Sequence, residues 1–447
     1  MSSPDVSQRP HLPGRALAVL LAGARRESLP EAGVPAPQTH FGGKFRSVDF
    51  ALSNCLNSGI RRIGVVSAFR SHSLQRHLKR GWSFLKGDAS EFITLLPGDA
   101  QRGGGTGAQE NARLAMSALR DLLAGTSAEY VLLLTGDRIY KMNYASMLAD
   151  HVAKGRDCTV ACLEASPEHA PAGRVLSVDA QWQVTAWHAA KPGHALQGAT
   201  ARAAATPTWL GMGIYAFNRD PLLKMLALDL ADSGSDHDLE NTIVAPTVKA
   251  GRASAHPFAL SCVSSASSKS RYWRDVGTVD AYWEANIDLT ASLPQLDLYD
   301  PHWPMRAQQA ELAPAKFLHN EANRRGMAVE SLVSGGSIIS GSVQRSVLFP
   351  SVRVHSYASV AWSVLLPAVQ VGRHVRLNRV VVDRGCSIPD GMVIGEDAQA
   401  DALRFYRTER GITLVTAEML ARLPGAALIQ PNPQSKLQPD PQAQPNP

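Results

Sequence analysis

Residues 354–371 read VHSYASVAWSVLLPAVQV, and branched aliphatic residues recur along this stretch at intervals of about six. The recurrence continues toward the C-terminus and comprises Val354, Val360, Leu366, Val371, Leu377, Val382, Ile388 and Ile394. This period is typical of a left-handed parallel β-helix, in which each coil contributes short strands and points aliphatic side chains inward. An antiparallel β-sandwich is the alternative for a region so rich in Val, Gly and Ser. We predict a left-handed β-helix domain over residues 331–425.

The chain before residue 293 has a different pattern, in which short apolar runs alternate with amphipathic stretches. This alternation is typical of strand-helix-strand units on a mostly parallel sheet. The expected strands are residues 16–21, 62–67, 130–135, 158–163 and 210–217, and the expected helices include residues 112–123 and 279–287. We predict a Rossmann-like α/β domain over residues 12–292, whose ligands lie beyond the carboxyl ends of the strands.

Three further segments complete the predicted organisation. Residues 293–330 begin with a Pro-rich, weakly patterned stretch, so we expect a linker there. Residues 400–423 are expected to form a helix, a strand and a second helix. Residues 426–447 consist largely of Pro, Gln and Asn, a composition that cannot bury enough apolar surface to fold, and we expect a disordered tail.

Composition argues against several classes of protein. The 447 residues carry 45 Lys and Arg against 39 Asp and Glu, and no basic stripe interleaved with aromatic residues indicates nucleic-acid binding. The net charge of +6 suits phosphorylated small molecules, although an ordinary solvated surface explains it equally well. The five cysteines form no CxxC pair, which favours a reduced, cytoplasmic protein. The apolar run at residues 16–22 is shorter than the roughly 20 residues of a membrane span, so we expect no membrane anchor.

Two aspartates occupy places suited to a metal site. Asp137 follows the apolar run 131–135 and a glycine, and Asp275 lies within RYWRDVGT at residues 271–278. Because a parallel strand presents the residues at its carboxyl end to the ligand, Asp137 is the stronger candidate. Two carboxylates from distant segments can hold one Mg²⁺ and leave its other positions to water and phosphate oxygens. For Asp137 a turn or capping role is the alternative.

Two groups of cations suggest binding of phosphate. His40, Lys44 and Arg46 surround two glycines, which permit close approach of the backbone to an anion, although a loop that helps two domains to pack is the alternative. Lys191 precedes a proline after an expected hairpin of residues 174–179 and 183–187. A lysine binds phosphate as a mobile point charge, whereas an isolated Lys-Pro pair is also common in a surface turn.

The motifs of this chain resemble the glucose-1-phosphate adenylyltransferase (ADP-glucose pyrophosphorylase) family from residue 16 to residue 420. The matching motifs are HFGGKFRSVDFALSNC at 40–55, AHPF at 255–258, YWRDVGT at 272–278, SLVSGG at 331–336, GMVIGE at 391–396 and RFYR at 404–407. The family joins ATP to glucose 1-phosphate and releases pyrophosphate in bacterial glycogen and plant starch synthesis. The resemblance implies a nucleotidyltransferase domain followed by a left-handed β-helix, Mg²⁺ as cofactor, and a homotetramer or a heterotetramer with a paralogue.

The resemblance also implies roles for individual residues. Catalysis falls to Asp137, Lys191 and Arg25, and the metal to Asp137 and Asp275. The nucleotide is expected at Gly23 and Arg25, and glucose 1-phosphate at Lys191, Gly173 and Gly211, with Arg174 replacing the sugar-side glycine in another alignment. An anionic allosteric effector, a sugar bisphosphate or AMP, is expected at His40, Lys44 and Arg46.

Several positions depart from the family pattern where substrates are expected. The family loop Gly-Gly-x-Gly-x-Arg-Leu reads GARRESL at residues 23–29, so that Arg26 replaces a glycine and Ser28 an arginine. Ala190 stands in place of a sugar-binding glutamate. Each lost charge-assisted hydrogen bond costs about 1.5–3 kcal/mol. An active adenylyltransferase is therefore the main prediction, and a catalytically weak regulatory subunit or paralogue, or a pyrophosphorylase with changed nucleotide or sugar preference, are the alternatives.

Overall fold

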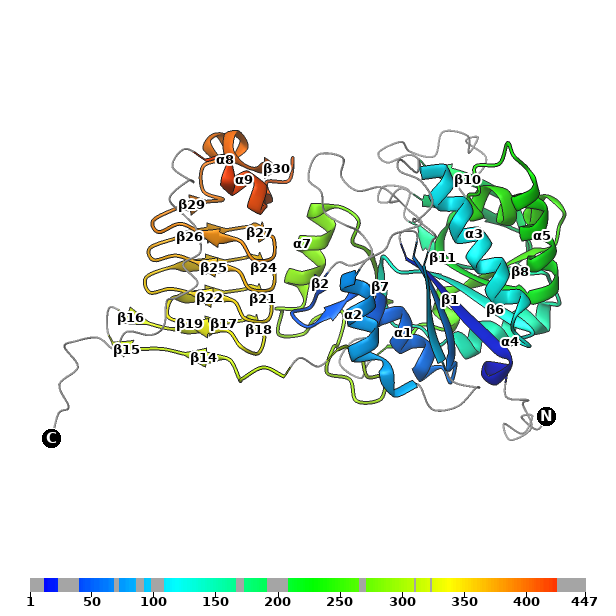
Figure 1. The fold of residues 1–447 in the computed structure, drawn as a ribbon, viewed down its shortest axis with the longest axis horizontal. Helices are drawn as coiled ribbons and strands as arrows, with labels where there is room; N and C mark the ends of the chain where they lie inside the picture. Colours follow the sequence, from blue (N-terminus) through cyan, green and yellow to red (C-terminus); the bar gives the residue numbers. More distant parts are fainter. Residues whose placement is uncertain are drawn as a thin grey trace. The chain divides into compact units, whose positions relative to one another are not determined.

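The computed structural model divides the chain into two compact units, Met1–Glu311 and Leu312–Pro447 (Figure 1). The structure describes residues 12–22, 40–67, 72–85, 92–97, 108–165, 173–190, 208–264, 271–308, 311–321 and 324–423. Each unit has its own hydrophobic core. Within these segments no helix is both long enough and apolar enough to cross a membrane.

The first unit is built on a nine-stranded sheet. Its central strand β1 (Ala16–Ala22) is parallel to β4 (Arg62–Ser67) and β6 (Tyr130–Thr135), and β5 (Phe92–Pro97) continues the parallel set beyond β4. Strand β11 (Thr208–Asn218) lies beside β6 and runs antiparallel to it. The remaining strands are β8 (Cys158–Ala165), β9 (Gly173–Val178), β10 (Val184–Ala190) and β12 (Ala253–Pro257). The α/β prediction is confirmed, and β11 is antiparallel to its three neighbours β6, β8 and β9.

Helices cover both faces of this sheet, as a doubly wound fold requires. Alternate residues of β1 face opposite sides, so that Ala18 and Leu20 enter one core and Leu17 and Val19 enter the other. The first core is completed by α1 (Ser47–Asn57), α2 (His72–Gly81) and α4 (Tyr144–Lys154), and the second by α3 (Ala108–Ala124) and α5 (Arg219–Ala231). The other helices of the unit include η6 (Leu239–Val244), α6 (Ala245–Lys249), η7 (Phe258–Leu260) and α7 (Val279–Asp288).

The second unit is a parallel β-helix made of three sheets (Figure 1). The first sheet contains β14 (Lys316–Phe317), β19 (Ile338–Ile339), β22 (Arg353–Val354), β25 (Gln370–Val371) and β28 (Ser387–Ile388). The second contains β17 (Met327–Val329), β20 (Ser342–Gln344), β23 (Ser359–Ala361), β26 (Arg376–Asn378) and β29 (Val393–Ile394). The third contains β18 (Leu332–Val333), β21 (Val347–Leu348), β24 (Val364–Leu365), β27 (Val380–Val382), β31 (Thr413–Val415) and β30 (Tyr406–Arg407). Helices α8 (Ala398–Arg404) and α9 (Ala417–Ala421) follow, and thus the predicted fold class is confirmed.

In the later coils of this β-helix, each coil is one residue shorter than three steps of six. Val354 pairs with Val371, which pairs with Ile388, so that equivalent residues are 17 positions apart. The prediction placed Leu366 inside, whereas Leu365 is the fully buried residue that pairs with Val382. The step from the inward residue Val360 to the next inward residue, Leu365, is therefore five residues and not six. Because Leu365 and Leu366 are both leucines, the sequence pattern does not show which of them points inward.

The predicted linker, residues 293–330, also differs from the structure at its C-terminal end. Strands β14 and β17 lie inside it and pair with β19 and β20, so the first coil begins before residue 331. From β14 to β19 the spacing is 22 residues, which interrupts the regular recurrence that marks later coils. The earlier part lies along α1, where the Trp303 indole donates to Asn54 Oδ1 at 2.8 Å. The tail predicted for residues 426–447 lies outside the described residues.

Candidate active site

Two short antiparallel strands bring the predicted metal ligands together at the carboxyl end of β6. Strand β7 (Arg138–Tyr140) follows Asp137 directly, and β13 (Trp273–Asp275) pairs with it. In this pairing Asp275 lies opposite Arg138, so that two carboxylates far apart in the sequence flank one guanidinium. Sequence patterns predict the pair of aspartates, but they contain no signal for the arginine between them.

The Arg138 guanidinium is shared between the two carboxylates. Its Nη1 lies 3.2 Å from Asp137 Oδ2 and 2.6 Å from Asp275 Oδ1. The arginine side chain is 8% exposed, against 17% for Asp137 and 23% for Asp275, so that these ion pairs are partly shielded from water. The guanidinium also lies over the indole ring of Trp273, 5.5 Å from its centre. One positive charge thus faces two negative charges in a mostly buried position.

The donors of this cluster fit a Mg²⁺ ion in their chemistry. Asp137 Oδ1 is buried and has no hydrogen-bond partner among the described residues. An unsatisfied buried carboxylate oxygen is costly, and carboxylate oxygens are the ligands that Mg²⁺ prefers. The described segments contain no group of three or more His, Cys, Asp or Glu residues placed to hold a metal. Asp137 and Asp275 can therefore supply two ligands, and the remaining positions would go to water or substrate oxygens.

The predicted sugar-side residues gather on the neighbouring strands. Gly173 begins β9 and pairs with Ala190, the residue before Lys191, while Lys191 itself lies outside the described residues. Gly211 lies on β11, and a methyl group built on it would be 3.5 Å from the carbonyl oxygen of Arg174. The structure therefore brings Gly173 and Gly211 to adjacent strands, with the chain continuing from β10 toward Lys191.

The sugar side and the metal side meet at the end of β6. Gly213 of β11 has a φ of +73°, and a Cβ placed on it would come within 2.8 Å of Thr135 Oγ1. Leu21 of β1 pairs with Thr135 as well. The chain that leaves β1 toward the predicted nucleotide residues, Gly23 and Arg25, thus starts beside this site, but these two residues lie outside the described residues.

The predicted effector segment forms a hairpin that packs on α7. Strands β2 (His40–Phe41) and β3 (Phe45–Arg46) pair, and the Tyr282 hydroxyl of α7 donates to the His40 carbonyl at 2.7 Å. Lys44 is exposed at the turn, and Arg46 donates from Nη2 to Ser73 Oγ at 2.9 Å. The hairpin therefore has a clear packing role within the first unit, and its binding of an effector stays a prediction.

Comparison with known proteins decides the relationship. Residues 31–292 match the nucleotidyl transferase family, and residues 313–415 match the GlmU-like, C-terminal hexapeptide family. A glucose-1-phosphate adenylyltransferase of Albidiferax ferrireducens is 50% identical over 92% of this chain and 96% of its own length. The proteins of the same name from Pectobacterium carotovorum and an Enterobacter species are each 48% identical over 92% of this chain, and over 96% and 95% of their own lengths.

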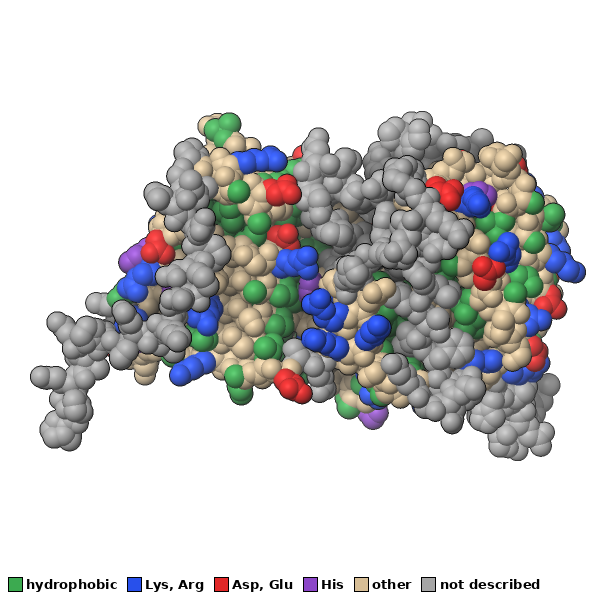
Figure 2. Space-filling model, in the orientation of Figure 1, with side chains coloured by type: hydrophobic (Ala, Val, Ile, Leu, Met, Phe, Trp, Pro, Cys, Tyr) green, Lys and Arg blue, Asp and Glu red, His purple; other side chains and the backbone are tan. Residues whose placement is uncertain are grey.

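The chain belongs to the glucose-1-phosphate adenylyltransferase family of nucleotidyl transferases. Members of the wider nucleotidyl transferase family act on nucleotide and sugar phosphate substrates, generally with a divalent metal. In Figure 2 basic side chains gather over α2, whose sequence HSLQRHLKRG carries Lys79 and Arg80 in its last turn.

Lys141 lies four residues after Asp137 and forms a buried ion pair with Asp300. Its Nζ is 3.1 Å from Asp300 Oδ2, and both side chains are buried, at 5% and 7% exposure. Asp300 also accepts a hydrogen bond from the backbone N–H of His302 at 2.9 Å. Although burial alone would raise the pKa of Asp300, these hydrogen bonds and the Lys141 charge hold it below its usual value. Lys141 therefore anchors the chain that follows α7.

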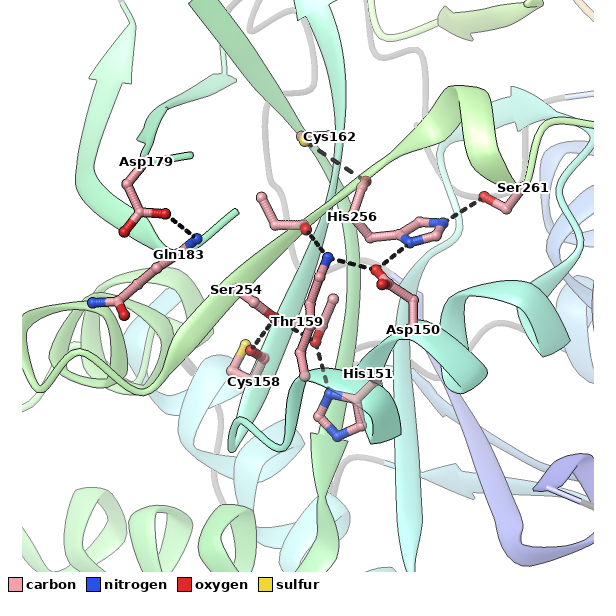
Figure 3. A network of polar contacts seen from close by, with 12 residues as sticks. Asp150, His151, Cys158, Thr159, Cys162, Asp179, Gln183, Ser254, His256 and Ser261 are labelled. Carbon is pink, nitrogen blue, oxygen red and sulfur yellow. Dashed lines mark hydrogen bonds and ion pairs between the residues drawn. The ribbon is translucent and has the colours of Figure 1, made fainter. Parts of the chain in front are cut away.

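A second polar network, drawn in Figure 3, lies within the α/β unit and was not predicted from the sequence. His256 places Nδ1 2.7 Å from Asp150 Oδ2 and Nε2 3.0 Å from Ser261 Oγ. The order Ser-His-Asp is that of a nucleophilic triad. However, His256 is 1% exposed and Ser261 is 3% exposed, so that a substrate cannot reach the hydroxyl.

The contacts around this network indicate a structural role. Lys154 Nζ lies 2.7 Å from both Asp150 Oδ2 and the Ala255 carbonyl, and the Ser261 carbonyl accepts from Asn143 N at 2.8 Å. Burial opposes ionisation of Asp150, but hydrogen bonds from His256 and Lys154 lower its pKa below the usual value. The network thus fastens α4 to β12 and the turn that follows it (Figure 3).

Proposed function

We propose that this protein is a glucose-1-phosphate adenylyltransferase, which transfers the adenylyl group of ATP to glucose 1-phosphate and releases pyrophosphate in glycogen biosynthesis. The observation that supports this most strongly is the 50% identity to a protein of that name over 92% of the chain. The convergence of Asp137 and Asp275 at the carboxyl end of β6 adds support, since ligands of such folds bind at that edge.

The reaction sets clear requirements for the residues at this edge. A phosphate oxygen of glucose 1-phosphate attacks the α-phosphorus of ATP, and the bond from that phosphorus to the β-phosphate bridging oxygen breaks. We assign Lys191, Gly173 and Gly211 to the sugar phosphate. We assign Arg25 and Gly23 to the triphosphate. Asp137 and Asp275 would hold Mg²⁺, which, when bound, neutralises the negative charge that gathers on the phosphate oxygens.

A regulatory paralogue with weak catalysis is the second candidate. The loop GARRESL lacks two residues of the family pattern, and Arg138 occupies the space between the two carboxylates. Such a chain would contribute an effector site at His40, Lys44 and Arg46 to a heterotetramer. A pyrophosphorylase with changed nucleotide or sugar preference is the third candidate, because Ala190 stands in place of a sugar-binding glutamate of the family pattern.

Pyrophosphate release from ATP, glucose 1-phosphate and Mg²⁺ tests the proposal directly. We expect activity from the protein alone, reduced by about a hundredfold or more in Asp137→Asn, since removing one preorganised charge contact typically has that effect. Asp121→Asn is the matched control, because Asp121 is an exposed aspartate near the far end of α3 that pairs with its neighbour Arg120. No activity alone, but activation of a co-expressed family member, would support the regulatory role. Faster turnover with UTP, GTP, CTP or dTTP would favour the third candidate.

Assembly, regulation and location complete the proposal. We propose a homotetramer, or a heterotetramer with a paralogue, and an anionic effector such as a sugar bisphosphate or AMP. A cytoplasmic location is supported by the cysteines, because all five lie in described segments and none of the five forms a disulfide. Burial raises the pKa of Cys162 to about 12, so this thiol is unreactive at neutral pH.

A further inference from the structure

The pairing of Arg138 with the two aspartates is incomplete on both sides. Pairs of arginine and carboxylate are frequently bidentate, with two parallel N–H···O hydrogen bonds. Here one nitrogen, Nη1, serves both Asp137 and Asp275, while Nε of Arg138 and Oδ1 of Asp137 are buried with no hydrogen-bond partner among the described residues. The cluster therefore retains donor and acceptor capacity that this arrangement does not use.

The backbone position of Arg138 is nevertheless fixed by the packing and pairing of β7. The residue belongs to β7, whose next two residues, Ile139 and Tyr140, are fully buried. Its guanidinium lies against the Trp273 ring, and the β7–β13 pairing holds that ring on the neighbouring strand. The backbone of Arg138 is thus fixed beside both carboxylates, while its long side chain can move the charge by changing rotamer.

The Arg138 guanidinium and a divalent cation compete for Asp137 and Asp275 because both are positively charged. The two carboxylates attract either cation, but a guanidinium and a metal ion within a few ångströms of each other repel strongly where water is partly excluded. A metal bound by Asp137 and Asp275 would therefore have to displace Arg138 from the contact it makes at 2.6 Å with Asp275.

We propose that Arg138 is a resident counterion of Asp137 and Asp275, which a divalent metal must displace before it can bridge the two carboxylates. The inference rests on the proposed function in one respect, namely that these two aspartates hold the metal. Its consequence is that the free protein binds metal weakly, and that the displaced guanidinium becomes available to an anionic ligand.

Mn²⁺ binding without substrates tests the proposal, with the electron paramagnetic resonance signal of free Mn²⁺ as the readout. We expect Arg138→Gln to bind Mn²⁺ about tenfold more tightly than the wild type, because one charge-assisted contact no longer has to be broken. Arg138→Lys keeps the charge and should retain weak binding. Arg120→Gln is the control, since the Arg120 side chain is 40% exposed and pairs with the adjacent Asp121. Equal or weaker binding by Arg138→Gln, or no binding by either protein, would overturn the proposal.

Tryptophan fluorescence provides a second measurement on the wild-type protein. Displacement of the guanidinium removes the charge from the Trp273 ring, so Mg²⁺ should change the emission, and Trp273→Phe should remove that change. Should Arg138→Gln fail to fold, an emission unaltered by saturating Mg²⁺ overturns the proposal by itself. The two hypotheses can fail separately. Tight Mn²⁺ binding by Arg138→Gln without adenylyl transfer by the wild type would refute the function alone, and adenylyl transfer with unchanged Mn²⁺ affinity would refute the inference alone.

Discussion

Replacing Lys141 by methionine should destabilise the first unit substantially, because it leaves Asp300 charged and buried without its counter-charge. The two side chains are 3.1 Å apart, and both are more than nine-tenths buried. Removing one partner of such a pair costs about 3–5 kcal/mol. At roughly 2 °C for each kcal/mol in a unit of this size, the unfolding temperature should fall by about 6–10 °C.

Thermal unfolding followed by circular dichroism measures this effect, with Lys224→Met as the matched control. Lys224 is exposed on α5, and such surface substitutions usually change the free energy of unfolding by less than about 0.5 kcal/mol. The double variant Lys141→Met, Asp300→Asn should be more stable than Lys141→Met alone, because the uncompensated charge is removed. Equal unfolding temperatures for Lys141→Met and Lys224→Met would refute the reasoning.

The effect of pH supplies an independent check of the same pair. The pKa of Asp300 lies below its usual value in the folded protein, so its ionisation stabilises the fold at pH values above the ordinary aspartate pKa of about 4. This contribution is lost as the pH falls through the lowered folded pKa. The difference between wild type and Lys141→Met should therefore narrow below about pH 4. A difference that stays constant between neutral pH and pH 3 would contradict the assigned ion pair.

Three further outcomes follow from packing and from the second polar network. Gly395→Ala should destabilise the β-helix by more than about 3 kcal/mol in urea unfolding, because the added Cβ would lie 1.7 Å from the Asn378 carbonyl oxygen. Gly391→Ala is the control. Gly391 also has a positive φ but has open space around it, so this substitution should cost only about 1–2 kcal/mol. Ser261→Ala should lower stability by about 1 kcal/mol and leave pyrophosphate release unchanged, whereas a large loss of kcat would identify the network as catalytic. Asn143→Ala should cost about 1 kcal/mol, since its side chain caps α4 by accepting from the backbone N–H of Ala145, and an unchanged unfolding temperature would contradict the cap.

The strands of the α/β unit could be predicted well because a strand that is buried on both faces has a simple sequence pattern, a short run of apolar residues. The expected strands at 62–67 and 130–135 coincide with β4 and β6. Parallel strands between two helical layers consist of nearly continuous apolar residues, and few other segments have that composition. The antiparallel direction of β11 is not visible in its residue composition, because strand direction depends on pairing with strands that are distant in the chain.

The candidate site was accessible from sequence only in part. Motifs identify Asp137 and Asp275, but the position of Arg138 between them depends on the register of β7 and β13, which only long-range pairing determines. Likewise, the choice between Leu365 and Leu366 as the inward residue depends on the length of one side of the coil. A repeating pattern gives the average period of the coil. It cannot show where one step is a residue shorter when both candidate positions, 365 and 366, are leucine.

The stacking of the coils has a consequence for how this domain can change in length during evolution. Equivalent residues in successive later coils are 17 positions apart, whereas β17 and β20 are related by a step of 15. Since each coil contacts only the coils next to it, gain or loss of one whole coil leaves every remaining interface intact. Insertions of other sizes must be extruded at a corner, as the 22-residue step between β14 and β19 illustrates. Relatives in this family should therefore differ in β-helix length by whole coils or by loops at corners, and their inward positions should keep their register on either side of such a change.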